Sequence, residues 1–132
     1  MTEPKLADSL LNLSRALLRL REALAVPSDQ ALAVDGTIQR FEFTIELCWK
    51  TLKRALAFEG IDTTTPREAL VQAFAVGLID DETAWLDMLR DRNRAAHIYD
   101  EAMAVDLYQR IRLHATNIEN LRQRLVERYR LS

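Results

Sequence analysis

Cysteine, glycine and proline are all scarce in this sequence. The one cysteine, Cys48, excludes an internal disulfide and cannot build a zinc site made of cysteines. Three glycines and three prolines among 132 residues supply few of the turns that a many-stranded β fold requires. The shortage of turn residues therefore favours a helical protein before any periodicity is considered.

A basic excess and a long apolar run are also missing. Lysine and arginine number 18 against 20 aspartate and glutamate residues, so the net charge of −2 does not suit a protein that coats nucleic acid. We expect any polyanion contact to be local, and we expect no DNA partner. No apolar run approaches membrane-spanning length, and residues 1–5 lack the basic-then-apolar layout of a secretion signal. We therefore expect a soluble cytoplasmic protein that makes no membrane contact.

Apolar residues recur at steps of three and four along most of the chain, which is the spacing of helices that bury one face. The length fits a single domain over residues 1–132. A capping box at Thr65 and Glu68, and capping aspartates at position 80 or 81 and at position 100, mark helix starts. The predicted helices cover residues 6 to 26, 34 to 59, 66 to 76, 82 into the nineties, and 101 to about 129.

Polar residues interrupt several predicted apolar faces. Arg92 falls in the fourth helix on a stripe with Trp85, Leu89, Ala96, Tyr99 and Met103, where burial of its charge requires an anionic partner. His114 lies on the apolar seam of the last helix, and we interpret it as a core or interface histidine with a satisfied hydrogen bond. Glu42 and Glu46 share one helix face. We expect them on the solvent side; the alternative is a pairing with an arginine of the 92–101 segment or of a partner.

Residues 92–101 gather side chains that suit phosphate chemistry without a metal. His97 can move protons near neutral pH, as in abstraction of a proton from a ribose 2′-hydroxyl. Arg92 can grip phosphate oxygens and stabilise charge on phosphorus, and Asn93 can orient either group. In one continuous helix, Arg92 and His97 would point roughly 140° apart. We therefore expect a helix break near His97, which a cap at Asp100 permits, or a site completed by a second copy.

Two other interpretations of the same segment stay open. His97 and Glu101 lie four residues apart with Asp100 beside them, which is a metal-ligand spacing, but no third or fourth ligand is evident. We accordingly expect neither a metal nor a cofactor. In the second interpretation the segment only stabilises a dimer, through a pair between Arg92 and an acid.

Four sequence blocks, taken together, resemble a known family. Arg92, His97 and Tyr99 match the Arg-x4-His-x-Tyr signature of the HEPN superfamily. More closely, the chain resembles the small helical proteins called nucleotidyltransferase substrate-binding proteins. The blocks that carry this resemblance are residues 40–53, residues 65–68 with 73–74 and 77–79, residues 85–93, and residues 97–101.

The resemblance implies an all-α fold, an up-and-down antiparallel four-helix bundle with an extra short helix. It also implies a homodimer made together with a separate minimal nucleotidyltransferase. Many HEPN proteins are toxins that cut RNA without a metal, with the nucleotidyltransferase as antitoxin. An older description of the closer family is a non-catalytic subunit, whose dimer groove holds a substrate that the partner nucleotidylates.

Carried over by the signature, Arg92 would stabilise phosphate, His97 would be the general acid or base, and Asn93 a polar helper. Tyr99 would be the candidate acceptor of AMP, and Asp100 and Glu101 would be supporting residues. The acids around the motif, Asp87 and Asp91 included, would repel RNA unless arginines from elsewhere, such as the last helix, line the groove.

Overall fold

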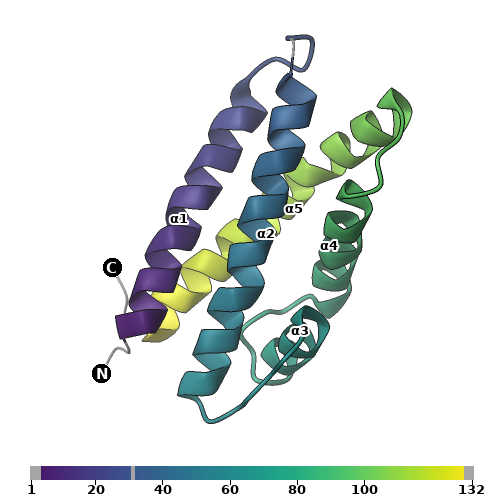
Figure 1. The fold of residues 1–132 in the computed structure, drawn as a ribbon. Helices are drawn as coiled ribbons and strands as arrows, with labels where there is room; N and C mark the ends of the chain where they lie inside the picture. Colours follow the sequence, from purple (N-terminus) through teal and green to yellow (C-terminus); the bar gives the residue numbers. More distant parts are fainter. Residues whose placement is uncertain (1–3, 31, 130–132) are drawn as a thin grey trace.

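The computed structural model describes residues 4–30 and 32–129, which form five helices and no strand. Figure 1 shows α1 and α2 side by side, α5 crossing behind them, and α4 beside α2 with the short α3 below it. Successive long helices run in opposite directions, so the predicted up-and-down four-helix bundle with an extra short helix is confirmed. The helices are α1 (Pro4–Ala25), α2 (Ala33–Phe58), α3 (Pro66–Ala75), α4 (Glu82–Ala95) and α5 (Glu101–Tyr129).

Side-chain caps start three of the helices at the predicted places. The Thr65 hydroxyl accepts a hydrogen bond from the Glu68 N–H at 3.1 Å, and Asp81 and Asp100 cap α4 and α5 in the same way. The predicted capping box is only half formed, because the Glu68 carboxylate accepts from the Thr64 hydroxyl at 3.3 Å instead of reaching back to Thr65.

The core lies where α1 and α2 pack against α5. Every residue of the predicted seam of α5 is buried: Leu107, Ile111, His114, Ile118, Leu121 and Leu125. Phe41, Ile45 and Cys48 face this seam from α2 and are at most 2% exposed. Burying a large apolar side chain contributes about 1.5–3 kcal/mol, so this seam holds the bundle together.

Small polar side chains join α1 to α2. The Ser9 and Thr51 hydroxyls share a hydrogen bond of 2.7 Å, and the Thr44 hydroxyl donates to the Arg40 carbonyl within its own helix at 2.7 Å. Thr44 packs at Ala16, whose carbonyl lies 3.4 Å from the same hydroxyl. Because these side chains are small, the two helices approach closely, and larger residues are left on their outer surface.

The buried face of α4 differs from the predicted stripe. Trp85, Met88 and Asp91 are buried, whereas Arg92 and Leu89 are half-buried. The helix ends at Ala95, so Tyr99 leaves the stripe and is 80% exposed. The predicted stripe is confirmed at Trp85 and at the half-buried Arg92, and it was wrong in leaving out Met88 and the charged Asp91. None of the described helices is both long and apolar enough to cross a membrane.

Candidate functional site at the end of α4

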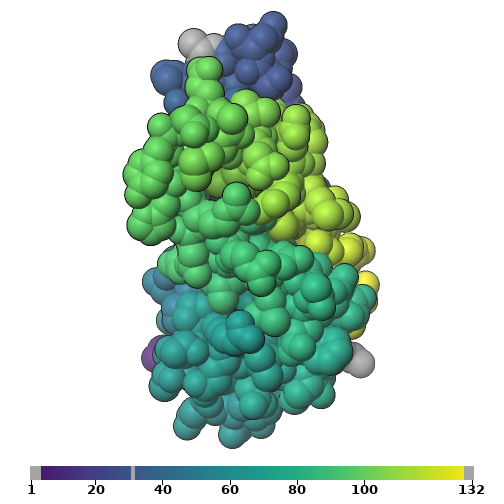
Figure 2. All heavy atoms as spheres, turned by 90° about the vertical axis from the view of Figure 1, so that its right-hand side faces the viewer, coloured from purple at the N-terminus to yellow at the C-terminus, as the bar shows by residue number. Residues whose placement is uncertain are grey.

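The 92–101 segment spans a helix break, which is one of the two arrangements that the sequence predicted. Helix α4 ends at Ala95, the His97 N–H donates to the Arg94 carbonyl at 2.9 Å, and α5 starts at Glu101. Figure 2 faces this part of the molecule, with α4 and the first turns of α5 in green above α3 in teal. The break releases the side chains after Ala95 from the helical face that carries Arg92.

Arg92 lies against α2. Its Nη2 donates to Glu46 Oε2 at 2.5 Å, and its Nη1 donates to Asn93 Oδ1 at 3.3 Å. The side chains of Arg92 and Glu46 are 32% and 33% exposed, and Lys50 lies 3.6 Å from the second Glu46 oxygen. The solvent-side prediction for Glu46 was therefore wrong, and the alternative pairing with the motif arginine is confirmed. The Arg92 side chain is not fully covered by this pairing, so a phosphate can still reach it.

His97 and Tyr99 form an exposed pair of their own. His97 Nδ1 and the Tyr99 hydroxyl share a hydrogen bond of 3.2 Å, with the rings tilted by 50°. Tyr99 thus accompanies His97, whereas the sequence placed it beside Arg92. Among the described residues no hydrogen bond links Arg92 to His97. One chain presents two half-sites: Arg92 with Asn93 and Glu46, and His97 with Tyr99.

The two supporting acids serve the start of α5. Asp100 Oδ1 accepts from the Met103 N–H at 2.8 Å, so its carboxylate is occupied as a cap. Glu101 is exposed in the first turn, where negative charge stabilises a helix. No three His, Cys, Asp or Glu residues of the described ranges are grouped so that they could hold a metal ion. The alternative of a metal at His97 and Glu101 therefore gains no support.

A buried cluster behind Arg92 was missed by the sequence prediction. Asp91 is 2% exposed and accepts hydrogen bonds from His114 Nε2 at 2.6 Å and from both Nε and Nη2 of Arg110, the former at 3.1 Å. Burial by itself raises the pKa of Asp91, but the hydrogen bonds and positive charge of Arg110 and His114 outweigh it and hold the pKa below the ordinary value. His114 also stacks on Phe41, with ring centroids 5.5 Å apart.

This cluster fixes the last turn of α4. Asp91 ties the turn to α5 and the next residue, Arg92, ties it to α2. The interpretation of His114 as a core histidine with a satisfied hydrogen bond is confirmed at Nε2, although Nδ1 is buried with no hydrogen-bond partner in the described part of the chain. The three-residue step from Trp85 through Met88 to Asp91 is the signal that would have revealed the cluster.

The arginines near the end of α5 do not line the motif. Arg124 donates to Asp80 Oδ2 at 3.0 Å and to the Gly77 carbonyl, and Arg128 donates to Glu59 at 2.8 Å and to the Val76 carbonyl. Both arginines hold α5 against the ends of α2 and α3. Of the α5 arginines, Arg110 approaches the motif region, and its charge is taken by Asp91.

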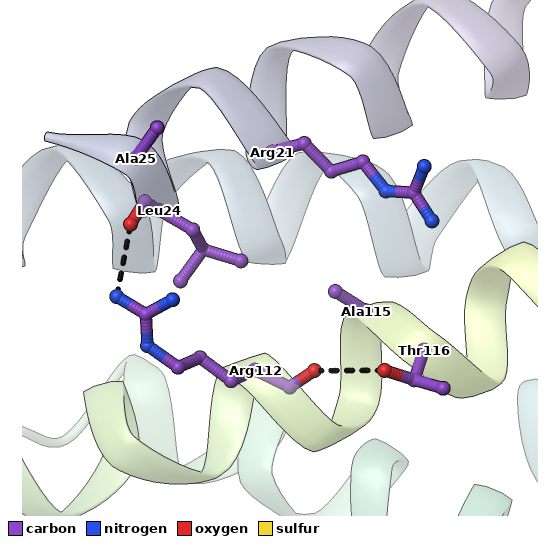
Figure 3. A pocket seen from close by; sticks show the side chains of 6 residues that line it. All are labelled: Arg21, Leu24, Ala25, Arg112, Ala115 and Thr116. Atoms are coloured by element: carbon purple, nitrogen blue, oxygen red, sulfur yellow. Dashed lines mark hydrogen bonds between the residues drawn. The ribbon is translucent and has the colours of Figure 1, made fainter.

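Another α5 arginine closes a pocket on the far side of the bundle. Figure 3 shows Arg112 reaching from α5 to α1, where its Nη2 donates to the Leu24 carbonyl at 2.9 Å. The bond satisfies a carbonyl in the last turn of α1, which has no helical partner. The pocket of about 290 Å³ between Arg112 and Arg21 contains none of the predicted site residues. We assign Arg112 a structural role, the joining of α5 to the end of α1.

Comparison with known proteins finds a curated relative that is similar to part of the chain. Over 87 residues it is 34% identical to a Haemophilus influenzae protein named "Probable ribonuclease HepT", covering 62% of this chain and 60% of that relative. The chain thus spans less than two thirds of the length of this curated relative.

Two solved structures are similar over nearly their whole length. HI0074 from Haemophilus influenzae, described as having the fold of a substrate binding domain of a nucleotidyltransferase, superposes with a TM-score of 0.79 at 29% identity, covering 88% of this chain and 98% of that one. A protein from Thermus thermophilus has a TM-score of 0.75 at 29% identity, with coverage of 89% and 98%. Residues 8–127 match the family described as "Nucleotidyltransferase substrate binding protein like", and the chain belongs to that family, as its four sequence blocks predicted.

Proposed function

We propose that this protein is a metal-independent RNA endonuclease of the HEPN type, acting as the toxin of a two-component toxin-antitoxin module. Its antitoxin is a separate minimal nucleotidyltransferase, and residues 1–132 act as one domain in the cytoplasm. The observation that carries the proposal is the break after α4, which leaves Arg92 one-third exposed and His97 exposed, so that the two side chains can meet a phosphate and a 2′-hydroxyl. Similarity to a protein named a ribonuclease supports it.

The residue chemistry fits cleavage by internal attack. The imidazole of His97 takes the proton from a ribose 2′-hydroxyl, and the 2′-oxygen bonds to the adjacent phosphorus. The bond from phosphorus to the 5′-oxygen breaks, and that oxygen takes a proton from a second, protonated imidazole. The products are a 2′,3′-cyclic phosphate and a free 5′-hydroxyl. Arg92 stabilises the charge on the phosphorus centre, while Asn93 orients its guanidinium from 3.3 Å.

A homodimer brings together Arg92 and His97, which a single chain keeps apart. Arg92 and His97 occupy separate half-sites within the chain, and the mechanism uses two imidazoles. In the proposed dimer the twofold axis passes between the two half-sites, so that Arg92 of one copy lies opposite His97 of the other. RNA then binds in the cleft between the two copies.

Tyr99 is the proposed point of control by the nucleotidyltransferase. Its hydroxyl is accessible to another protein, since the residue is 80% exposed. The phenolic oxygen attacks the α-phosphorus of ATP, the phenolic proton is lost to solvent, and pyrophosphate leaves. The AMP group adds bulk and negative charge at an oxygen 3.2 Å from His97 Nδ1, and this blocks RNA from the imidazole.

Expression of the chain without its nucleotidyltransferase tests this function. We expect growth arrest and RNA fragmentation with the wild type, and neither effect with His97→Ala or Arg92→Ala. Arg90→Ala is the matched control, because Arg90 is 71% exposed two residues earlier in the same helix and should retain toxicity. Equal growth of all strains with intact RNA would contradict the proposal.

The second candidate function is a non-catalytic subunit that binds a nucleotide or substrate for the nucleotidyltransferase. It is favoured by the pairing of Arg92 with Glu46. The Glu46 carboxylate neutralises the charge of Arg92, and this suits a structural role for the arginine. This candidate predicts a stable complex with the nucleotidyltransferase and no RNA cleavage by the isolated protein. Co-purification of the two proteins, together with the cleavage assay, separates the two functions.

A further inference from the structure

A basic and aromatic groove lies on the outer surface between α1 and α2, which run side by side in Figure 1. The cavity measures about 390 Å³ and is lined by Asn12, Arg15, Arg19, Arg40, Phe43 and Leu47, with the buried Ala16 between the helices. The close α1–α2 packing through Thr44 leaves these longer side chains to form its walls. None of them belongs to the 92–101 segment.

The groove has a surplus of positive charge. In the described part of the chain, Arg15 and Arg40 have no carboxylate within salt-bridge distance, and Arg19 has only an exposed pair with Glu22 at 3.6 Å. Exposed pairs of this kind are weak and exchange readily with other anions. A chain with a net charge of −2 therefore keeps three arginines available at one concave surface.

An aromatic ring stands among these arginines. Phe43 is 58% exposed and Leu47 beside it is half-buried, so a flat apolar surface adjoins the guanidinium groups. Arginines that track phosphates, combined with an aromatic side chain on which bases stack, are the features by which proteins hold single-stranded nucleic acid. A symmetric contact between two copies through this groove would instead bring arginine against arginine. The groove is therefore complementary to a nucleotide chain and not to itself.

The groove adjoins the proposed cleavage site across α2. Arg40, Phe43 and Leu47 follow helical spacing and share one face of α2. Glu46, which holds Arg92, points about 90° away around the same helix at 100° per residue. A strand that leaves Arg92 can thus cross the surface of α2 into the groove.

We propose that the α1–α2 groove binds single-stranded RNA beside the cleavage site, with one base stacked on Phe43 and a phosphate held by Arg15 and Arg40. The inference rests on the proposed function only in naming RNA as the substrate. Binding in the groove and cleavage at His97 depend on different residues and can be measured separately.

The test uses the His97→Ala chain and a fluorescent single-stranded RNA of about twelve nucleotides, with affinity followed by anisotropy across a salt series. Adding Phe43→Ala should weaken binding about fivefold to a hundredfold, the usual effect of losing one stacked base. Adding Arg40→Gln should make the slope of log affinity against log salt shallower by about 0.7, because one phosphate contact of a single strand is lost.

Matched controls come from α3, where Phe74 is 45% exposed and Arg67 lies near the helix start. Phe74→Ala and Arg67→Gln should bind RNA as the parent does. Equal affinity of parent and groove variants would overturn the proposal, and so would an equal loss in the α3 controls. A shift of Phe43→Ala from dimer to monomer in sedimentation would overturn it as well, since the groove would then be a contact between copies. Free AMP and unlabelled oligonucleotide can each be tested as competitors of the fluorescent RNA. If AMP displaces it at the same concentration as the oligonucleotide does, the groove binds mononucleotides and the RNA assignment is overturned.

The two proposals fail in different ways. If wild-type protein never cleaves RNA but the groove variants still lose affinity, the groove is upheld and the endonuclease function fails. If wild-type protein cleaves RNA and the groove variants bind normally, the endonuclease function is upheld and the groove assignment fails.

Discussion

Arg92 of α4 donates a 2.5 Å hydrogen bond to Glu46 of α2, a residue 46 positions earlier in the chain. The pair has two consequences. It orients the guanidinium that we assign to phosphate binding, and it neutralises a charge that an RNA phosphate would otherwise meet in full. Glu46 is therefore a competitor for Arg92 as well as its anchor.

Replacing Glu46→Gln should strengthen RNA binding while slightly lowering stability. The carboxylate no longer neutralises Arg92, so a phosphate gains the full attraction, whereas loss of a one-third exposed ion pair costs about 1 kcal/mol or less. RNA anisotropy and thermal unfolding of the His97→Ala chain with and without the change check both effects. A lower stability with unchanged RNA affinity would assign the pair a structural role alone.

Replacing Asp91→Asn should lower the free energy of unfolding by about 3 kcal/mol, because a buried carboxylate loses its charge between His114 and Arg110. Urea denaturation near neutral pH measures the change. Asp87→Asn is the control, since Asp87 is 52% exposed and pairs with an exposed arginine, and it should alter stability by less than about 1 kcal/mol. Similar values for both variants would contradict a stabilising role of the cluster.

Asp91 should also make the protein sensitive to acid. The pKa of its carboxyl in the folded chain lies below the ordinary value of an aspartate, so the folded state favours the ionised form more than the unfolded state does. The stability it contributes is full above the unfolded pKa and is lost as pH falls through the folded pKa. Denaturation curves from neutral pH down to strongly acidic pH should therefore show a shallower decline for Asp91→Asn than for the wild type. Parallel declines would mean that other carboxylates dominate acid unfolding.

Mixing two inactive variants tests whether the site is shared between copies. A dimer of one Arg92→Ala chain and one His97→Ala chain retains an intact Arg92 and an intact His97 on different subunits. If RNA cleavage uses Arg92 of one copy with His97 of the other, unfolding and refolding the mixture should restore part of the activity, with water protonating the 5′-oxygen in place of the missing second imidazole. Two active groups confined to one chain would leave the mixture as inactive as each variant alone.

Tyr99→Phe should remove AMP acceptance and keep RNA cleavage. The substitution deletes only the hydroxyl, which shares its hydrogen bond with His97 Nδ1 and is not needed as a proton donor in the proposed mechanism. Intact-mass measurement after incubation with the nucleotidyltransferase and ATP should show the adenylyl group on wild type alone. Adenylylation of Tyr99→Phe would place the acceptor elsewhere.

The fold was predictable because its main features are local. Leucine spacing defined α1, the seam through Ile111 and His114 defined α5, and Thr65 and Asp100 marked helix starts that the structure confirms. The break near His97 followed from the Asp100 cap in the same way. Each of these signals depends on residues within a few turns of one another.

The candidate site was less predictable because its contacts join distant segments. The partner of Arg92 lies on α2, and a carboxylate within an apolar stripe suggests either solvent or an ion pair until the helices are packed. The buried face of α4 was misplaced since Asp91 is charged, and only its contacts with His114 and Arg110 explain its burial. Tyr99 was placed beside Arg92 by helical periodicity, which ceases to apply once the helix ends at Ala95.

Cleavage of RNA by the purified protein in the presence of a metal chelator tests the central claim most directly. The proposal predicts that the wild type cuts single-stranded RNA under these conditions and leaves 2′,3′-cyclic phosphate ends, and that His97→Ala leaves the RNA intact. RNA that stays intact with the wild type, or that is cut equally by wild type and His97→Ala, would contradict the assignment of this protein as a metal-independent endonuclease.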